Sequence, residues 1–186
     1  MRLLALVLLS TLLVSCSFLN EKMTVKPYNN SHLKSGELKY RAPKAWTQEK
    51  PKMPMRLDQY RITPQGSILE ATLSVYTFPG MVGGVDANLE RWIGQFKDDG
   101  KRELGEIQQF NYRGLPVTIV YISGTYVRSL APMLANAPTE EVSNQGLLAA
   151  IVELKEKKYF FKMIGDKDAV YAETDRFDEL ISSLKI

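Results

Sequence analysis

The sequence predicts an α+β fold in which an antiparallel β-sheet of about six to seven strands is flanked by helices. Most segments alternate between apolar and polar residues, which is typical of half-buried strands. Short turns containing Gly or Pro separate these segments, so neighbouring strands are expected to pair antiparallel. Two segments repeat their apolar residues at helical spacing, and amphipathic helices of this kind need a sheet face to cover. We expect residues 37–186 to form this single domain.

The first predicted elements are strands. Leu and Tyr alternate with Lys and Arg at 38–41, which predicts a short strand. A turn at 42–45 then directs Trp46 toward the core. Strands at 55–62 and 68–78 follow, separated by the sequence Thr-Pro-Gln-Gly. Because Pro presets its own φ and Gly supplies a positive φ, these two strands are expected to form a hairpin.

A helix is predicted over 87–97. Its apolar residues recur at i, i+3, i+4 and i+7, and they are Leu89, Trp92, Ile93 and Phe96. Asp86 is the predicted N-cap, since its side chain can accept from the first free N–H groups. Gly83 and Gly84 before it are expected to turn the chain sharply, and the N–H groups at this helix start are able to hold an anion.

The remaining chain predicts four more strands and a closing helix. The expected segments are strands at 106–112, 115–127, 147–154 and 159–164, and a helix at 166–184. Arg113-Gly114 marks the turn of the first pair, and Glu153 and Lys162 are expected to pair across the second. Residues 128–144 between the pairs are expected to form a long loop.

The N-terminus has the pattern of an export signal. Arg2 precedes a run of about a dozen apolar residues, which is too short for a membrane span of ~20 residues. The run ends in Leu13-Val14-Ser15-Cys16, which resembles the lipobox of bacterial lipoproteins. The resemblance implies that residues 1–15 are removed and that Cys16 is acylated and becomes the mature N-terminus. The alternative is an ordinary secretory signal in which Cys16 is incidental.

A lipid anchor would fix the location of the domain. Residues 16–36 are rich in turn formers and are expected to form a flexible tether with a reach of roughly 25 Å. Two or three acyl chains anchor stably, so the membrane is the first expected partner. The residue after Cys16 is Ser17, not the Asp that retains lipoproteins in the inner membrane of enterobacteria-like cells. The expected location is therefore the cell envelope, on the outer membrane facing the periplasm.

Composition narrows the functional classes. The chain has 186 residues and a formal charge of +3, with basic residues scattered along it. A charge this small does not favour nucleic-acid binding. Cys16 is the single cysteine, so a disulfide within the chain is impossible and stability must come from packing.

No motif for catalysis stands out. The single histidine, His32, lies in the expected tether, which disfavours a Ser-His or Cys-His mechanism. The paired carboxylates at 98–99 and 140–141 are neighbours on the chain and diverge, so we interpret them as solvated charges. The segment 79–84 lacks the spacing and the Gly-Lys-Ser/Thr ending of a phosphate loop. We therefore expect no catalytic residue, no metal ligand and no cofactor.

Six segments of the predicted domain resemble a group of uncharacterised exported bacterial proteins. The residues that carry the resemblance are Trp46, 55–60, 76–84, 88–96, 114–126 and 148–165. In element order that group is similar to the PsbP-like fold, an α-β-α sandwich found in photosystem II extrinsic proteins and in a nuclear-import factor. The resemblance implies a binding or assembly module that does no chemistry of its own.

The candidate binding surface combines the start and one face of the first helix with the long loop. Its residues are Gly83, Gly84, Arg91, Trp92, Leu130, Met133 and Leu134. The leading hypothesis is that this surface binds another envelope protein or a small ligand. A second hypothesis is a carrier or chaperone for an apolar molecule held near Trp46, Trp92 and 129–144. A third is an enzyme that uses carboxylates and Arg91.

Overall fold

The computed structural model describes residues 35–186, apart from 54, 80–82, 132–133 and 135. The strands are β1 (Thr47–Glu49), β2 (Arg56–Ile62), β3 (Ala71–Pro79), β4 (Glu103–Leu104), β5 (Gln108–Tyr112), β6 (Leu115–Ser129), β7 (Thr139–Glu153) and β8 (Lys157–Asp166). The helices are α1 (Val85–Ile93), α2 (Lys167–Ala172) and α3 (Thr174–Ser182). Cys16 and Met133 lie outside the described residues.

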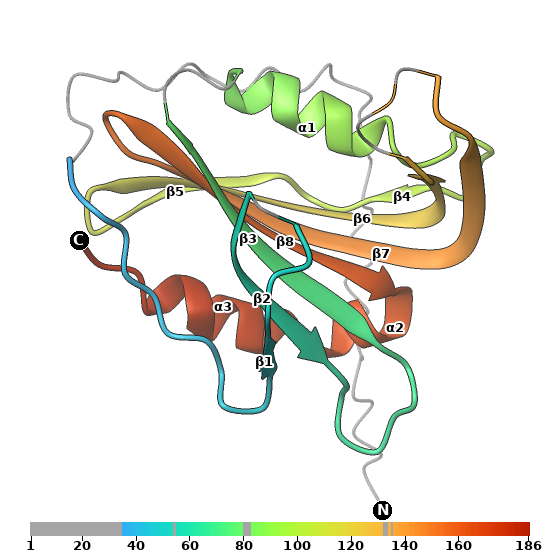
Figure 1. The fold of residues 1–186 in the computed structure, drawn as a ribbon, viewed down its shortest axis with the longest axis horizontal. Helices are drawn as coiled ribbons and strands as arrows, with labels where there is room; N and C mark the ends of the chain where they lie inside the picture. Colours follow the sequence, from blue (N-terminus) through green and yellow to red (C-terminus); the bar gives the residue numbers. More distant parts are fainter. Residues whose placement is uncertain (1–34, 54, 80–82, 132–133, 135) are drawn as a thin grey trace, which may run out of the picture.

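These elements form a sandwich around one sheet, which confirms the predicted α+β fold. The eight strands run in the order β1-β2-β3-β8-β7-β6-β4, and β5 also pairs with β6. Every pairing is antiparallel. Helix α1 lies on one face of the sheet, and α2 and α3 lie on the other (Figure 1).

The face under α2 and α3 carries the larger core. Alternate residues of the central strands point to this face because side chains alternate along a strand. Leu73, Val75, Phe161 and Met163 are fully buried there, against Phe177 and its neighbours in α3. Burial of each such side chain stabilises the fold by roughly 1.5–3 kcal/mol.

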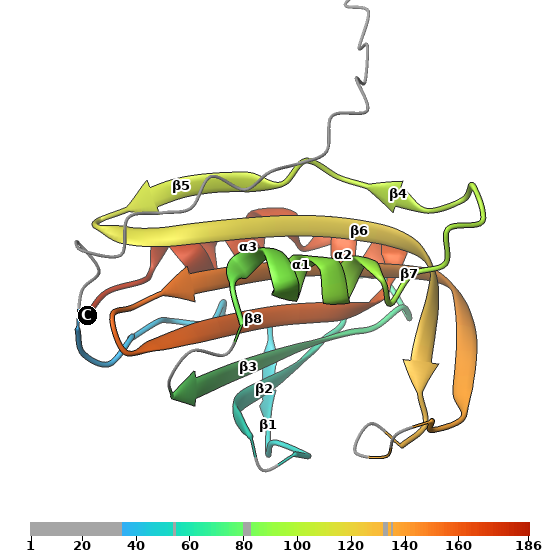
Figure 2. The same ribbon diagram turned by 90° about the horizontal axis from the view of Figure 1, so that it is seen from above.

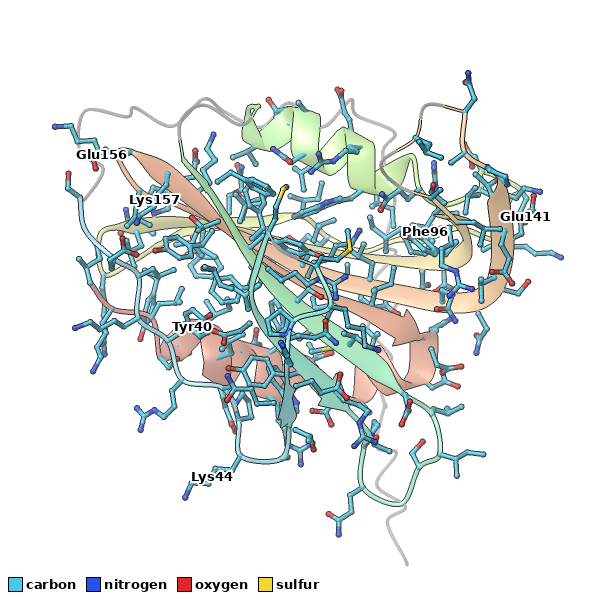
Figure 3. All side chains as sticks on the ribbon, viewed as in Figure 1. Tyr40, Lys44, Phe96, Glu141, Glu156 and Lys157 are labelled. Atoms are coloured by element: carbon cyan, nitrogen blue, oxygen red, sulfur yellow. The ribbon has the colours of Figure 1, made fainter. Side chains whose placement is uncertain are left out.

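The face under α1 carries a smaller core. Leu89 and Trp92 of α1 pack against Ile151 and Phe160, and the rings of Trp92 and Phe160 meet edge-on at 6.2 Å. Phe96, just beyond the end of α1 (Figure 3), packs against the ring of Tyr126. Figure 2 shows that α1 lies over β6, β7 and β8 and leaves β1, β2 and most of β3 without a helix on this side.

Two predicted boundaries of α1 are wrong. The helix begins at Val85 and ends at Ile93, where the prediction was 87–97. Its N-cap is Gly84, and no side chain caps it, whereas Asp86 was the predicted cap. Asp86 instead lies in the first helical turn, where its charge still complements the helix dipole.

Three other predictions also need correction. The segment 38–41 is not a strand: Lys39 pairs with Lys185 in an isolated bridge, and Tyr40 packs edge-on against Phe161 at 5.0 Å. The predicted helix 166–184 is broken at Glu173 into α2 and α3. The expected loop 128–144 is mostly strand, because β6 and β7 stay paired as far as Ser129 and Thr139. Within the described residues, no helix has the length and apolarity needed to cross a bilayer.

Candidate ligand-binding groove

The uncovered part of the sheet forms the floor of a groove. Its cavity volume is about 820 Å³. Residues of β2, β3 and β8 form the floor, the loop that carries Met53 and Met55 lies on one side, and the far half of the β6–β7 hairpin lies on the other. A volume of this size falls within the range of about 300–1,000 Å³ that is usual for small-ligand sites. We call it the groove below.

Lys162 lies on the floor of the groove. In the register of β8 it stands between Ser74 of β3 and Ala149 of β7, so all three side chains share the α1 face. Its Nζ donates a 2.8 Å hydrogen bond to Oε1 of Gln95 and lies 6.0 Å from the centre of the Tyr126 ring. Burial, with Arg91 and Arg56 nearby, lowers the pKa of Lys162 from 10.5 to about 8.

Arg56 lies beside Lys162 at the start of β2. A bulge between Arg56 and Asp58 turns the arginine side chain to the α1 face, opposite Tyr76. The guanidinium Nε donates to the Tyr76 hydroxyl at 3.0 Å, and Nη1 donates to Oε1 of Gln59. The guanidinium also lies 5.6 Å from the centre of the Tyr76 ring. These contacts fix the cation without neutralising it.

A second cavity of about 250 Å³ adjoins the groove at Lys162. The two cavities share Tyr76, Gln95 and Lys162, and the smaller one extends to Arg91 and Trp92 of α1. Nη2 of Arg91 donates to Oδ1 of Asn88 one turn earlier, at 2.7 Å. The side chain of Trp92 is buried in the core while Arg91 is exposed, as their helical positions predicted.

The groove therefore carries a positive charge. Neither the groove nor the smaller cavity is lined by an Asp or Glu among the residues that the structure describes. Arg128 also lines the groove, and its charge is offset by an ion pair with Glu140. The hydrogen bonds of Arg56, Arg91 and Lys162 described above all go to amide oxygens or to a phenol. A negatively charged group is the natural complement of three such cations.

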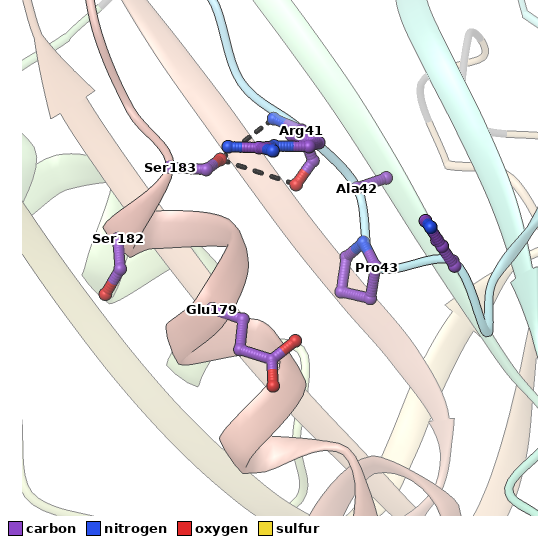
Figure 4. A pocket seen from close by; sticks show the side chains of 7 residues that line it. Arg41, Ala42, Pro43, Glu179, Ser182 and Ser183 are labelled. Carbon is purple, nitrogen blue, oxygen red and sulfur yellow. Dashed lines mark hydrogen bonds between the residues drawn. The ribbon is translucent and has the colours of Figure 1, made fainter.

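A third cavity, a depression of about 380 Å³, lies on the opposite side of the molecule, beside α3. Figure 4 shows the segment around Arg41 lying across the end of α3. The backbone N–H of Arg41 donates to the Ser183 hydroxyl at 2.8 Å, and Glu179 lies nearby on α3. Here a carboxylate and two cations, Arg41 and Lys44, share the lining. The carboxylate offsets part of the positive charge, which makes this depression a weaker candidate for an anion than the groove.

Only part of the predicted binding surface lies together. Arg91 and Trp92 line the smaller cavity, next to the groove. Gly83 and Gly84 lie at the opposite end of α1, where Lys158 donates from Nζ to the Gly83 carbonyl at 3.0 Å. The side chains of Leu130 and Leu134 are exposed near the tip of the β6–β7 hairpin.

Trp46 and Trp92 do not share a cavity. Trp46 packs in the core under α2 and α3, with Tyr60, whereas Trp92 belongs to the core under α1. The sheet separates them. The hypothesis of an apolar carrier that holds its cargo between both tryptophans is therefore wrong in its geometry.

The sequence analysis missed most of the groove. Lys162 was expected to pair with Glu153, but Glu153 pairs with Lys158 at 3.4 Å, because Lys158 is its direct partner in the β7–β8 register. Lys162 lies in the run Tyr-Phe-Phe-Lys-Met-Ile, where a charged residue interrupts apolar neighbours. That interruption was the one signal in the sequence that a cation lies on the α1 face of the sheet.

The described residues contain no group of three or more His, Cys, Asp or Glu side chains placed to hold a metal ion. Glu173, a carboxylate that is 1% exposed, bonds to Trp46 and Arg176 and so has a structural explanation. The groove itself offers cations, amides, hydroxyls and aromatic rings. Such a set can hold and orient an anion.

The chain matches no family model, and no curated protein matches its sequence. Among solved structures it is similar to cyanobacterial PsbP (CyanoP) from Synechocystis sp. PCC 6803, determined in solution. That match covers 80% of this chain and 92% of the other, at 15% sequence identity and a TM-score of 0.47. The likeness concerns the fold alone.

Proposed function

We propose that this protein is a lipid-anchored component of the bacterial cell envelope whose domain is a non-catalytic binding module. The groove is its binding site, for a small ligand or for a segment of another envelope protein. The observation that carries this proposal is the groove of about 820 Å³ with Lys162 on its floor and no Asp or Glu among its described lining residues. A partly buried cation without a carboxylate beside it is costly to keep, and a bound anion would offset that cost.

The arrangement of polar groups supports binding without chemistry. Lys162 is held by Gln95, and Arg56 is held by Tyr76 and Gln59. Each cation thus has a fixed position before any ligand arrives, which lowers the entropic cost of binding. The groups that hold them are two amides and a phenol, which orient each cation and leave its charge available to a ligand.

The lipid anchor is the second half of the proposal. It rests on the match of Leu13 to Cys16 with the lipobox. Acyl chains on Cys16 would keep the domain within roughly 25 Å of the bilayer through the tether 16–36. The groove would then sample ligands at the membrane surface of the periplasm.

The binding site can be tested by filling the groove. Ile164 lines its floor and Ser129 its rim. We would express the full chain in a bacterium, isolate it from the envelope in mild detergent and analyse it by native mass spectrometry. The wild-type chain is expected to retain a stoichiometric ligand or partner, and Ile164→Trp and Ser129→Trp are expected to lose it.

A matched control is Lys44→Trp, which places the same indole in the depression on the opposite side. This variant is expected to retain the same stoichiometric ligand or partner as the wild-type chain. Thermal unfolding of each variant identifies any loss of folding, and Ser129, at the partly exposed rim, is the site where a larger side chain is best tolerated. If both filled variants fold and still carry the wild-type ligand or partner, the groove is not the binding site.

A further inference from the structure

The groove combines charge with apolar surface. Met53, Met55, Val127 and Ile164 line it, together with the rings of Tyr76 and Tyr126. The side chains of Met53 and Met55 are 38% and 56% exposed, so this wall presents apolar surface to whatever enters. Methionine adapts its shape to irregular apolar partners. A wholly polar anion would leave this surface in contact with water.

Lys162 and Arg91 lie where the groove joins the smaller cavity, whereas Met55 lies in the loop before β2 and directly precedes Arg56. Lys162 is the residue at which the groove joins the smaller cavity with Arg91, and Tyr76 and Gln95 are shared at the same junction. Met53 and Met55 come from the loop before β2, at the outer wall. A ligand that reaches Lys162 and also covers Met53 and Met55 contacts both positive charge and apolar surface, which suits a molecule with a charged end and an apolar end.

We propose that the groove binds a single-chain amphiphile with an anionic head group, its head at Lys162 and Arg56 and its chain between the Met53–Met55 wall and the β6–β7 hairpin. This inference rests on the proposed function, because it names the ligand class of the same groove. Carboxylate and phosphate head groups share the required chemistry, since both accept charge-assisted hydrogen bonds from ammonium and guanidinium groups.

The protonation of Lys162 makes the binding of an anionic head group depend on pH. The charged or titratable groups around it are Arg56 of β2, Tyr76 of β3, Arg91 of α1 and Tyr126 of β6. Burial raises the pKa of Tyr126, so this phenol stays neutral over the same pH range. Because the pKa of Lys162 in the free protein is about 8, its positive charge declines above that pH. Binding of an anion is expected to weaken as pH rises through 8.

The test uses the full chain in isolated membranes and a photoactivatable diazirine analogue of dodecanoate. After illumination, labelled peptides are mapped by mass spectrometry. Labels are expected in the Met53–Met55 segment and in β8. Unlabelled dodecanoate or dodecyl phosphate in excess is expected to remove the label, whereas dodecyltrimethylammonium, of the same chain length and opposite charge, is expected to leave it.

Two variants test the cations, and one serves as control. Lys162→Gln and Arg56→Gln are each expected to lower labelling about tenfold, the effect of losing one charge-assisted hydrogen bond. Lys155→Gln removes an exposed lysine from the β7–β8 turn and is expected to label as the wild type does. Thermal unfolding confirms that each variant is folded, and two separate cations keep the test valid if one substitution destabilises the domain.

The outcomes separate this inference from the proposed function. Equal labelling of wild type, Lys162→Gln and Arg56→Gln, or equal competition by dodecyltrimethylammonium, would overturn the anionic head group. If either outcome is found but the labelled peptides all come from the groove, the groove is still the binding site and only the anionic head group is wrong. Labelling that persists in folded Ile164→Trp would overturn the amphiphile inference, because the probe would then bind elsewhere. The proposed function fails only if the ligand or partner retained from the envelope also persists in both folded variants, Ile164→Trp and Ser129→Trp.

Discussion

The indole Nε1 of Trp46 donates a 2.7 Å hydrogen bond to Oε2 of Glu173, although the two residues are 127 positions apart in the chain. Both side chains are buried, at 6% and 1% exposure. The other carboxylate oxygen of Glu173 accepts from Arg176 at 2.6 Å. This contact joins the segment before β1 to the junction of α2 and α3.

Loss of that hydrogen bond should destabilise the domain. Trp46→Phe keeps an aromatic ring beside Tyr60 but removes the donor, leaving a buried carboxylate oxygen without its partner. We expect the free energy of unfolding to fall by about 2 kcal/mol, because bonds to charged groups are worth about 1.5–3 kcal/mol. Urea unfolding measures this. Glu173→Gln is expected to cost at least as much, because an oxygen kept for Trp46 leaves the amide NH2 facing the donors of Arg176. A loss below about 0.5 kcal/mol in Trp46→Phe would contradict the explanation.

The partly buried Lys162 should make stability depend on pH. The pKa of Lys162 is lowered to about 8 in the folded protein, whereas in an unfolded chain it is about 10.4. Between these values the unfolded state binds more protons, so the wild-type protein gains stability as pH rises. Lys162→Met removes the effect. We expect the variant to be more stable at pH 7 by about 1–2 kcal/mol, a figure reduced for the remaining solvent contact of the lysine.

Urea unfolding at pH 7, 8.5 and 10 tests this prediction. The advantage of Lys162→Met over the wild type should shrink steadily across that range. Tyrosines with raised pKa, such as Tyr126, affect both proteins equally and cancel in the difference. A difference in stability that stays constant from pH 7 to 10 would show that the lysine is not destabilised by burial.

Gly165 is required by a close approach of two strands. A Cβ on Gly165 would lie 2.3 Å from the carbonyl oxygen of Glu70 and 2.5 Å from Cα of Ala71, both of them backbone atoms. We expect Gly165→Ala to cost about 3 kcal/mol, the upper end for overpacking, since β3 and β8 would have to separate. Gly84→Ala is the control, because its Cβ would be 4.0 Å from the nearest atom. Thermal unfolding should show a much smaller loss for Gly84→Ala.

Acylation of Cys16 can be tested directly. Cys16→Ser replaces the thiol that the lipid would modify, so the variant is expected to remain as a precursor that retains residues 1–15. Intact-mass analysis of the chain from bacterial membranes should find acyl chains on the wild type and none on the variant. Normal maturation of Cys16→Ser, or an unmodified thiol in the wild type, would contradict the lipoprotein hypothesis.

Local signals predicted the hairpin strands β2, β3, β5, β6 and β8, because a hairpin is specified by neighbours in the chain, but they missed the short edge strands β1 and β4. Arg113 and Gly114 form a two-residue turn, with φ of 53° and 83°, and the strands on either side pair directly from Tyr112 and Leu115. The alternation in 68–78 likewise placed Leu73 and Val75 on the covered face. The turn and the alternation are each specified by a few residues that are adjacent in the chain.

Features that depend on distant contacts were missed. The apolar period of 166–184 is continuous, and nothing in it marks the break at Glu173, where the partner is Trp46. The groove likewise joins Arg56, Lys162 and Arg91 from three separate elements, and their proximity follows from sheet order, which the sequence pattern did not specify.

The far half of the β6–β7 hairpin leaves the sheet at Gly124, where φ is +146° and the register shifts before Tyr126. A Cβ there would approach Cα of Arg102 to 3.2 Å, so glycine suits this bend. The angle at which the far half of the hairpin bends away from the sheet sets the distance from Val127 and Ser129 to the loop that carries Met53 and Met55. A change at this one backbone irregularity would therefore alter the width of the groove while leaving Lys162 and Arg56 in place.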